Sequence, residues 1–236
     1  FSEKDKLLIV NGGTFGMRFT KICNVHGIPY QEILVPVGES LRRDHLKNFD
    51  NKGFTGLLVN LDETSTGQLY DIKMIRDFCL RNNICLVVDA ISTFLCDPFY
   101  MDDFGIDVAI FSSQKGLCLS PGLSVVLINE KTSEERVAMN NPRTIYFDFK
   151  NYFSNINRGQ TPFTPAVDIL LELNDMLRSL LDIGVNKQLE KIASRAAYFR
   201  SRVGEIGASL PNYTLSNAIT PIIFNKPTAT EIFNYL

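Results

Sequence analysis

The stretch DVAIFSSQKGLCLSPG, residues 107–122, joins a strand-length apolar run to a loop of small residues, with a lysine between them. A second apolar run, LSVVLIN (123–129), follows at once. Because the loop between the two runs is too short for a helical crossover, we expect 123–129 to run antiparallel to 107–113.

Upstream of this stretch, apolar runs alternate with small-residue breaks and amphipathic segments. The runs are LLIV (7–10), YQEILV (30–35), GLLVNL (56–61) and ICLVVDAI (84–91). Such alternation is typical of βα units on a sheet that is buried on both faces. The sequence therefore predicts an α/β fold with a mixed, mostly parallel sheet flanked by helices.

The second half of the chain has a different character. The periodic segment AVDILLELNDMLRSLL follows Pro165, which suits the first turn of a helix, and after a break at Gly184 a second helical pattern continues to about Val203. TPIIF (220–224) then indicates one strand and ATEIFNYL (229–236) one helix.

Two elements alone cannot bury a core, so we expect the chain to be a piece of a longer protein. We expect three parts: a large α/β domain at 1–164, long connecting helices at 165–205, and the start of a truncated α+β small domain at 206–236.

Composition excludes several classes of function. The 236 residues are 45% hydrophobic and 21% charged with a formal net charge of −2, as in ordinary globular proteins. The interspersed charges give no basic face for nucleic acid, and no apolar run reaches the ~20 residues of a membrane helix. The five cysteines lack a CxxC pattern, which favours reduced thiols and a cytoplasmic location. The histidines, His26 and His45, lack metal-ligand spacing, so we predict no metal site.

Asp89 and Lys115 follow two apolar runs that we expect to be neighbouring strands. Asp89 closes ICLVVDAI, so its carboxylate should emerge at the carboxyl edge of the sheet, where open α/β sheets bind ligands. Lys115 follows by 115 − 89 = 26 residues. The two form either a plain ion pair or the two ends of a cofactor site, with the lysine forming an imine and the aspartate binding a protonated ring nitrogen.

A different reading comes from Asn11-Gly12-Gly13-Thr14-Phe15-Gly16, which follows the first strand. It nearly matches the glycine-rich dinucleotide fingerprint, with Asn11 in place of the first glycine, and Glu32 could bind the ribose. A NAD(P)-dependent oxidoreductase is therefore an alternative function.

Five motifs together carry a family resemblance: NGGTFGMR (11–18), DETSTG (62–67), VVDAIS (87–92), SSQKGLCLSPG (112–122) and QTPFTPAV (160–167). In their order and spacing, the chain resembles class V pyridoxal-phosphate-dependent aminotransferases of fold type I. Within that class it is similar to the alanine–glyoxylate and serine–glyoxylate group, with 2-aminoethylphosphonate aminotransferases nearby.

The resemblance implies a mostly parallel sheet of the seven-stranded type and pyridoxal 5′-phosphate as cofactor. It also implies a transaminase that moves an amino group from a small donor to a 2-oxo acid such as glyoxylate or pyruvate. Alanine, serine and 2-aminoethylphosphonate are the types of donor that it suggests.

The resemblance also implies roles for single residues. Lys115 matches the catalytic lysine that binds the cofactor covalently and then moves the substrate proton. Asp89 matches the catalytic aspartate on the pyridine nitrogen. Phe15 falls where an aromatic ring stacks on the cofactor, and Ile91 would press on the opposite face.

Other residues match contacts to the cofactor's polar groups. Thr64, with Ser65 as a less favoured substitute, matches a hydroxyl that contacts the cofactor or its aspartate, and Gln114 matches a phosphate contact. Thr161 matches a residue that reaches the phosphate of the other subunit, which implies a homodimer with shared active sites. Arg158 stands where some relatives carry tyrosine and could add a phosphate contact or be solvated.

Two family features have no counterpart in the sequence. Relatives hold the phosphate mainly with a loop at a helix N-terminus upstream of LLIV, and they bind the substrate carboxylate with an arginine late in the small domain. We therefore expect both features to lie outside this chain. A non-catalytic relative that keeps the fold remains an alternative, as does a cysteine desulfurase, although those enzymes usually carry histidine where Gln114 stands.

Overall fold

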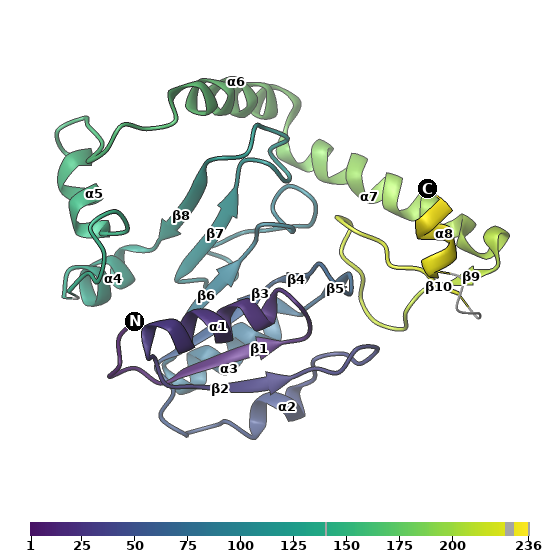
Figure 1. Cartoon of the computed structure of the whole chain (residues 1–236), viewed down its shortest axis with the longest axis horizontal. Helices are drawn as coiled ribbons and strands as arrows, with labels where there is room; N and C mark the ends of the chain where they lie inside the picture. Colours follow the sequence, from purple (N-terminus) through teal and green to yellow (C-terminus); the bar gives the residue numbers. More distant parts are fainter. Residues whose placement is uncertain (140, 225–228, 236) are drawn as a thin grey trace.

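The structure of the protein is a computed structural model that describes residues 1–139, 141–224 and 229–235 (Figure 1). The strands are β1 (Leu7–Asn11), β2 (Tyr30–Leu34), β3 (Gly56–Asn60), β4 (Asp62–Glu63), β5 (Gln68–Leu69), β6 (Cys85–Asp89), β7 (Val108–Ser112), β8 (Ser124–Ile128), β9 (Ala208–Ser209) and β10 (Ile223–Phe224). The helices are α1 (Gly16–His26), α2 (Arg43–Lys47), α3 (Ile72–Asn82), α4 (Glu130–Thr132), α5 (Phe149–Ile156), α6 (Val167–Ile183), α7 (Val185–Arg202) and α8 (Ala229–Tyr235).

The central sheet has six strands in the order β2-β1-β3-β6-β7-β8. All neighbours pair in parallel except β8, which runs antiparallel to β7 in the register Phe111↔Val125. The mostly parallel α/β sheet and the antiparallel last strand are therefore confirmed. The resemblance implies a sheet of the seven-stranded type, and the described residues supply six strands.

The apolar runs form central strands because both faces of the sheet are covered. Leu8 and Leu57 belong to a core cluster that includes residues of α2 and α3. Leu7 and Leu58 point to the other face, where they join Cys23 of α1. The near-continuous apolar runs of β1 and β3 thus fill two cores at once, as parallel strands do.

The strand order changes direction between β1 and β3, because β1 has β2 on one side and β3 on the other. Open α/β sheets bind ligands outside the carboxyl ends of the strands at such a point. Since β1, β3, β6 and β7 run parallel, the loops after them meet at one edge of the sheet.

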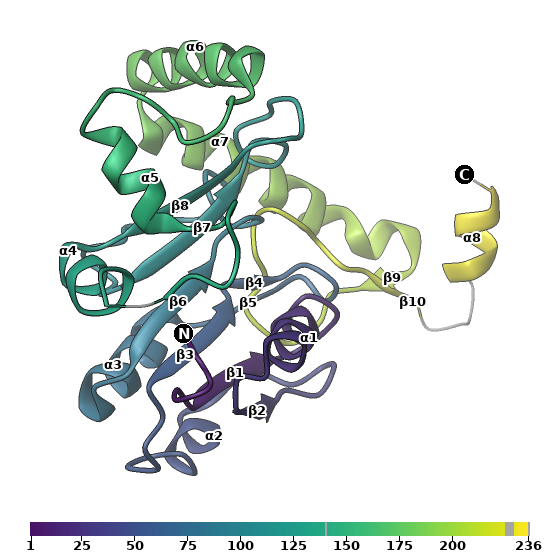
Figure 2. The ribbon, with the colours of Figure 1, turned by 60° about the vertical axis from the view of Figure 1, so that its left-hand side comes forward.

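The two long helices predicted after Pro165 are present as α6 and α7, with the break at Gly184, where φ is 90°. The prediction that Pro165 occupies the first helical turn is wrong, because α6 begins at Val167 with Ala166 as its N-cap. Leu180 of α6 packs with Phe111 and Leu117 beside the sheet. Figure 2 shows α7 leading away from α6 toward β9 and β10.

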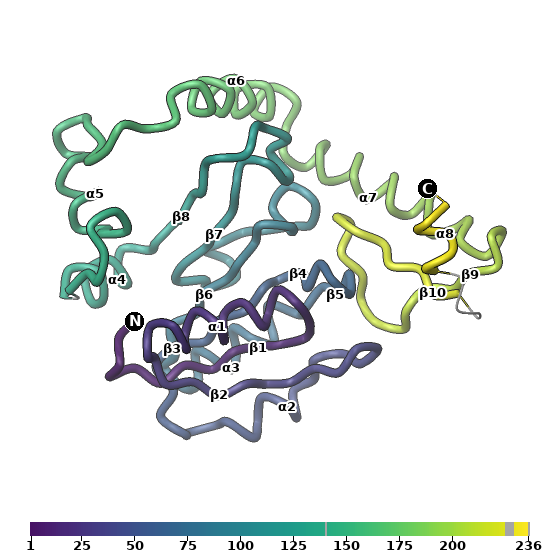
Figure 3. Tube along the Cα trace, viewed as in Figure 1, coloured from purple at the N-terminus to yellow at the C-terminus, as the bar shows by residue number. Residues whose placement is uncertain are grey.

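The last part of the chain forms the antiparallel pair β9–β10 and the helix α8. The strand predicted at 220–224 is shorter than expected, and residues 225–228 and 236 of the predicted small domain lie outside the described residues. Between β9 and β10 the chain passes beside the β4–β5 hairpin (Figure 3), where Leu215 forms an antiparallel bridge with Gln68 of β5. The division at 164 and 205 stays a prediction.

All five cysteines are unpaired thiols. Across the described residues, no helix is both long and apolar enough to cross a membrane, and no cluster of at least three histidine, cysteine or acidic side chains could hold a metal ion. The cytoplasmic location inferred from the cysteines stays a prediction.

Candidate active site

A cavity of about 340 Å³ opens at the carboxyl edge of the sheet. Its size lies in the range of small-molecule sites, roughly 300–1,000 Å³. The predicted site residues that line it are Phe15, Thr64, Asp89, Ile91, Gln114 and Lys115. They come from four separate loops, so the fold brings together side chains that are up to 100 positions apart, 115 − 15.

Asp89 ends β6, and two donors hold its carboxylate. Asn60 on the adjacent β3 donates from Nδ2 to Oδ2 at 2.9 Å, and the Ile91 N–H donates to Oδ1 at 2.8 Å. Burial raises the pKa of Asp89, while these two hydrogen bonds and the charge of Arg18 oppose the rise. The group is therefore oriented and partly solvated, with one side toward the cavity.

Lys115 lies exposed in the turn after β7. Its carbonyl accepts the Cys118 N–H at 2.8 Å, and Gly116 packs so tightly that an added Cβ would meet the Phe94 carbonyl oxygen at 2.0 Å. The backbone of this turn is thus closely packed, and Lys115 lines the cavity. Within the described part of the chain Lys115 forms no ion pair, so the plain Asp89–Lys115 ion pair is not supported.

The DETSTG segment separates the two candidate hydroxyl groups. The Thr64 hydroxyl lies 2.5 Å from the Ser92 hydroxyl, and both residues line the cavity. Ser65 instead donates to Glu63 at 2.5 Å and accepts the Thr14 N–H at 3.1 Å. The geometry therefore favours Thr64 over Ser65 as the ligand contact, and it adds Ser92, which the sequence did not single out.

Glu63 is a residue that the sequence analysis missed. Its carboxylate is fully buried at the start of α1, where it accepts the Gly16 N–H at 2.9 Å and the Phe15 N–H at 3.2 Å. An added Cβ on Gly13 would come within 2.7 Å of this carboxylate. Glu63 thus occupies the anion site of the helix N-terminus.

This contact bears on the dinucleotide alternative. A pyrophosphate bound in the usual way would need the backbone N–H groups at the start of α1, which already donate to Glu63. Glu32, the candidate ribose ligand, accepts a hydrogen bond from Asn11 Nδ2 at 2.6 Å. The geometry therefore speaks against a NAD(P) site at this turn.

Phe15 precedes α1, and its half-buried ring lies against an arginine. The Arg18 guanidinium carbon is 4.5 Å from the ring centroid, and Arg18 also lines the cavity. Phe15 and Ile91 border the same space. Their stacking on the two faces of a cofactor stays a prediction.

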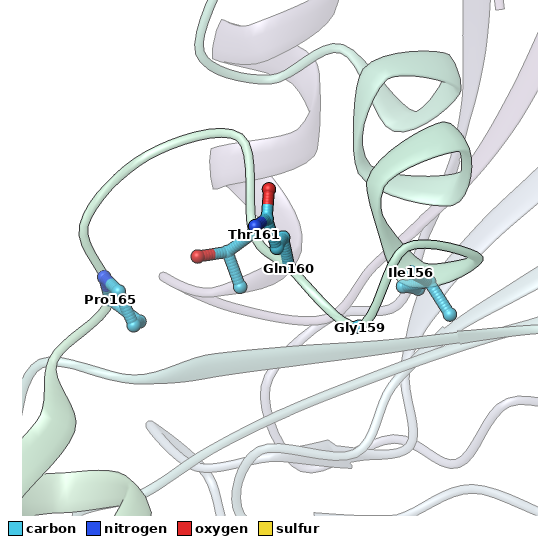
Figure 4. Close-up of a pocket in the computed structure, with 5 residues that line it drawn as sticks. All are labelled: Ile156, Gly159, Gln160, Thr161 and Pro165. Carbon is cyan, nitrogen blue, oxygen red and sulfur yellow. The ribbon is translucent and has the colours of Figure 1, made fainter.

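Thr161 and Arg158 do not reach this cavity within one chain. Thr161 lies exposed in a separate cavity of about 550 Å³, which is also lined by Ile156, Gly159, Gln160 and Pro165 (Figure 4). Its hydroxyl donates to the Phe163 carbonyl at 2.7 Å, and Arg158 donates to Gln160 at 3.2 Å. A role for either residue depends on a second copy of the chain and stays a prediction.

Asp62 is a second acid that the sequence analysis missed. It lines the cavity, is only 3% exposed, and neither carboxylate oxygen accepts a hydrogen bond within the described residues. Burial raises the pKa of Asp62 to about 7. The nearby Ser216 hydroxyl opposes the rise, the charges of Asp97 and Glu63 add to it, and the charge of Lys115 opposes it more weakly. Asp62 thus differs from Asp89, whose carboxylate accepts two hydrogen bonds.

The chain is similar to known proteins in sequence and in fold. The family model described as aminotransferase class-V matches residues 19–224. The chain belongs to the class-V aminotransferase family. Over 215 residues it is 30% identical to the L-aspartate–glyoxylate aminotransferase of Paracoccus denitrificans. The alignment covers 89% of this chain and 54% of that protein. It is 29% identical to a serine–glyoxylate aminotransferase of Arabidopsis thaliana, covering 75% of the chain and 46% of the relative.

Among solved structures, the alanine–glyoxylate aminotransferase of a Nostoc species superposes with a TM-score of 0.89 at 22% identity. The match covers 98% of this chain and 63% of that one, and at this identity it supports the fold alone. The chain spans about half the length of the curated relatives it matches.

Proposed function

We propose that this chain contributes the cofactor-binding half of a transaminase active site, with pyridoxal 5′-phosphate as the cofactor. The observation that carries the proposal is the placement of Asp89 and Lys115 in one cavity, on loops after the neighbouring strands β6 and β7. Within the described residues, Asp89 and Lys115 form no ion pair with each other. This arrangement fits a ligand that carries two groups: a basic nitrogen that pairs with the Asp89 carboxylate, and an aldehyde that reacts with the Lys115 amine.

The residues present fit this cofactor. Asp89 would accept the proton of the pyridine nitrogen, Thr64 and Ser92 offer hydroxyls, and Gln114 would contact the phosphate. When bound, the cofactor supplies an aldehyde for covalent attachment and a protonated ring that accepts an electron pair.

The protein's own groups have distinct tasks in this scheme. Asp89 would hold the proton at the ring nitrogen, because the hydrogen bonds from Asn60 and the Ile91 N–H orient its carboxylate and oppose the rise of its pKa. Lys115 would supply the amine for covalent attachment of the cofactor and, once free, would move the substrate proton, a role suited to a lysine that lines a cavity. Phe15 and Ile91 would exclude water from the two faces of the ring.

The names of the relatives indicate a class of substrates for this protein. The relatives named above use glyoxylate as acceptor according to their names, with aspartate, serine or alanine as donors. We propose a small amino donor and a 2-oxo acid of the glyoxylate or pyruvate type for this protein.

A homodimer with shared active sites completes the proposal. The segment that leads to the cavity containing Thr161 exposes several apolar side chains, and one of them, Ile156, lines the cavity. They are Met139, Ile145, Tyr146, Phe147 and Ile156, with exposed fractions from 54% to 82%. Exposed apolar patches of this kind mark protein interfaces. This surface supports the prediction that Thr161 acts in the partner's site.

The proposal is tested by spectroscopy on the intact protein purified with pyridoxal phosphate. We expect a visible absorbance band that changes when an amino donor such as alanine or serine is added. Lys115→Ala should lack the band, while Lys73→Ala, an exposed lysine on α3, should keep it. An unchanged band in Lys115→Ala would contradict the proposal.

A further inference from the structure

The segment between β9 and β10 is docked on the β4–β5 hairpin, which carries Thr64 into the cavity. Tyr213 donates from its hydroxyl to the Thr66 carbonyl at 2.7 Å, and the Leu69 N–H donates to the Thr214 carbonyl at 2.9 Å. The Ser216 N–H donates to the Gly67 carbonyl at 3.0 Å. We call residues 213–221 the strap.

Gly67 lets the strap approach this closely. Its φ is 70°, in the left-handed region, and an added Cβ would meet Pro221 at 2.4 Å. Both the backbone conformation and the contact with the strap therefore require glycine.

Asp97, from the loop after β6, anchors the strap by its carboxylate. It accepts the Ser216 hydroxyl at 2.6 Å and the Asn217 N–H at 3.0 Å, and all of Ser216 is buried. Arg200 of α7 holds the same segment by donating to the Thr220 hydroxyl at 3.1 Å and to the Ser216 carbonyl. The strap is thus tied to the sheet by a buried carboxylate.

Asp62 lies beside this anchor without a donor of its own. The Ser216 hydroxyl lies close enough to Asp62 to lower the pKa of that carboxyl group, but it donates its hydrogen to Asp97 at 2.6 Å. Within the described residues both oxygens of Asp62 are therefore left without a hydrogen bond. A buried carboxylate without a donor is costly when charged and much less so when neutral. The titratable groups that face Asp62 are Glu63, Tyr70, Cys96, Asp97 and Lys115, and Lys115 is the cation among them.

We propose that Asp62 is a proton-controlled latch: while its carboxyl group is neutral the strap stays docked on the β4–β5 hairpin, and when it ionises its repulsion from Asp97 loosens the strap. Because the hairpin carries Thr64, the latch links the state of this buried acid to one wall of the cavity. The latch is independent of the proposed transaminase activity, since it concerns only how the strap docks.

The pH range in which the strap loosens follows from the difference between the pKa of Asp62 in the docked and the undocked state. Burial raises the pKa of Asp62 from its ordinary 3.8 to about 7 while the strap is docked. Undocking exposes the group to water and returns the pKa toward 3.8. Docking therefore takes up a proton between these values, so the strap should dock more weakly as pH rises from about 4 to about 7 and reach a plateau above.

The test is amide hydrogen exchange on the intact protein at about pH 5.5 and about pH 8, corrected for the intrinsic exchange rate. Protection of the Leu69, Ser216 and Asn217 amides should fall roughly 10-fold from the lower to the higher pH. Asp62→Asn, which is uncharged and similar in shape, should keep high protection at both pH values. Asp102→Asn, at an exposed acid, should behave like the wild type.

Equal wild-type protection at both pH values would overturn the latch, as would an Asp62→Asn variant that retains the wild-type pH dependence. If Asp62→Asn does not fold, the carboxyl carbon of Asp62 is titrated by NMR in the wild type. A midpoint near 7 that rises further in Lys115→Ala supports the latch, because the Lys115 charge opposes protonation. A midpoint below about 5 contradicts it.

Discussion

Two carboxylates at the carboxyl edge of the sheet have opposite surroundings. Asp89 accepts hydrogen bonds from Asn60 and from the Ile91 N–H and is partly open to the cavity. Asp62, two residues after Asn60, is 3% exposed and accepts none. Burial raises the pKa of both groups. Two hydrogen bonds oppose the rise for Asp89, whereas the nearby Ser216 hydroxyl and the Lys115 charge leave the pKa of Asp62 at about 7. The comparison teaches that the fold orients the Asp89 carboxylate toward a ligand by two hydrogen bonds and buries the Asp62 carboxyl group in a setting that favours its neutral form.

The largest expected effect separates the two acids by activity. Asp89→Ala should lower kcat/KM for amino transfer by about 10²–10³-fold, because it removes a preorganised charge at the ring nitrogen. Asp62→Asn, measured at about pH 6 where Asp62 is still neutral, should change kcat/KM by less than about 5-fold. Similar losses in the two variants would erase the contrast between them.

A second prediction concerns Glu63, whose carboxylate accepts four hydrogen bonds. Glu63→Ala leaves the Phe15 and Gly16 N–H groups without an acceptor, so the free energy of unfolding in urea should fall by about 1–3 kcal/mol. Glu190→Ala, at an exposed position on α7, is the control and should cost less than about 0.5 kcal/mol. A loss for Glu63→Ala no larger than the control would mean that the helix start does not need this carboxylate.

The third prediction uses the pH dependence of stability. The folded-state pKa of Asp62 is raised, so its contribution is fully present below about pH 4 and is lost as pH rises through about 7. Asp62→Asn lacks this loss and should be more stable than the wild type by about 1 kcal/mol at pH 8, with the difference fading below about pH 5. The check is urea unfolding across this range, and a variant less stable than the wild type at pH 8 would refute it.

The smallest effect is expected at the hydroxyl pair. Thr64→Val removes one hydroxyl from the cavity wall and should weaken pyridoxal phosphate binding by about 2–10-fold, the value of one neutral hydrogen bond. Ser65→Ala should leave the affinity unchanged, since Ser65 faces Glu63. Fluorescence titration of the cofactor measures both, and the reverse order would favour Ser65.

Local patterns predicted the sheet, the antiparallel β8, the two long helices and the residues Asp89 and Lys115. These features depend on alternation, strand ends and short loops, which are local in sequence. The sequence did not reveal Glu63 as the partner of Gly16, because these residues are 47 positions apart and meet only after folding. Asp62 and Asp97 were missed for the same reason. Within DETSTG, the family resemblance marked the hydroxyl groups of Thr64 and Ser65, and no local pattern marked Asp62 or Glu63.

Thr161 and Arg158 lie apart from the cavity in a single chain, so their predicted phosphate contacts depend on how two copies associate. The exposed Tyr146 and Phe147 indicate where such a contact would form.

The most direct test of the central claim is chemical labelling of Lys115. The intact protein is incubated with pyridoxal phosphate, reduced with borohydride, digested and analysed by peptide mass mapping. The account predicts that the reduced cofactor is found on Lys115 and that the visible absorbance band disappears on reduction. No adduct, or an adduct spread equally over exposed lysines such as Lys73, would contradict a built cofactor site at this edge of the sheet.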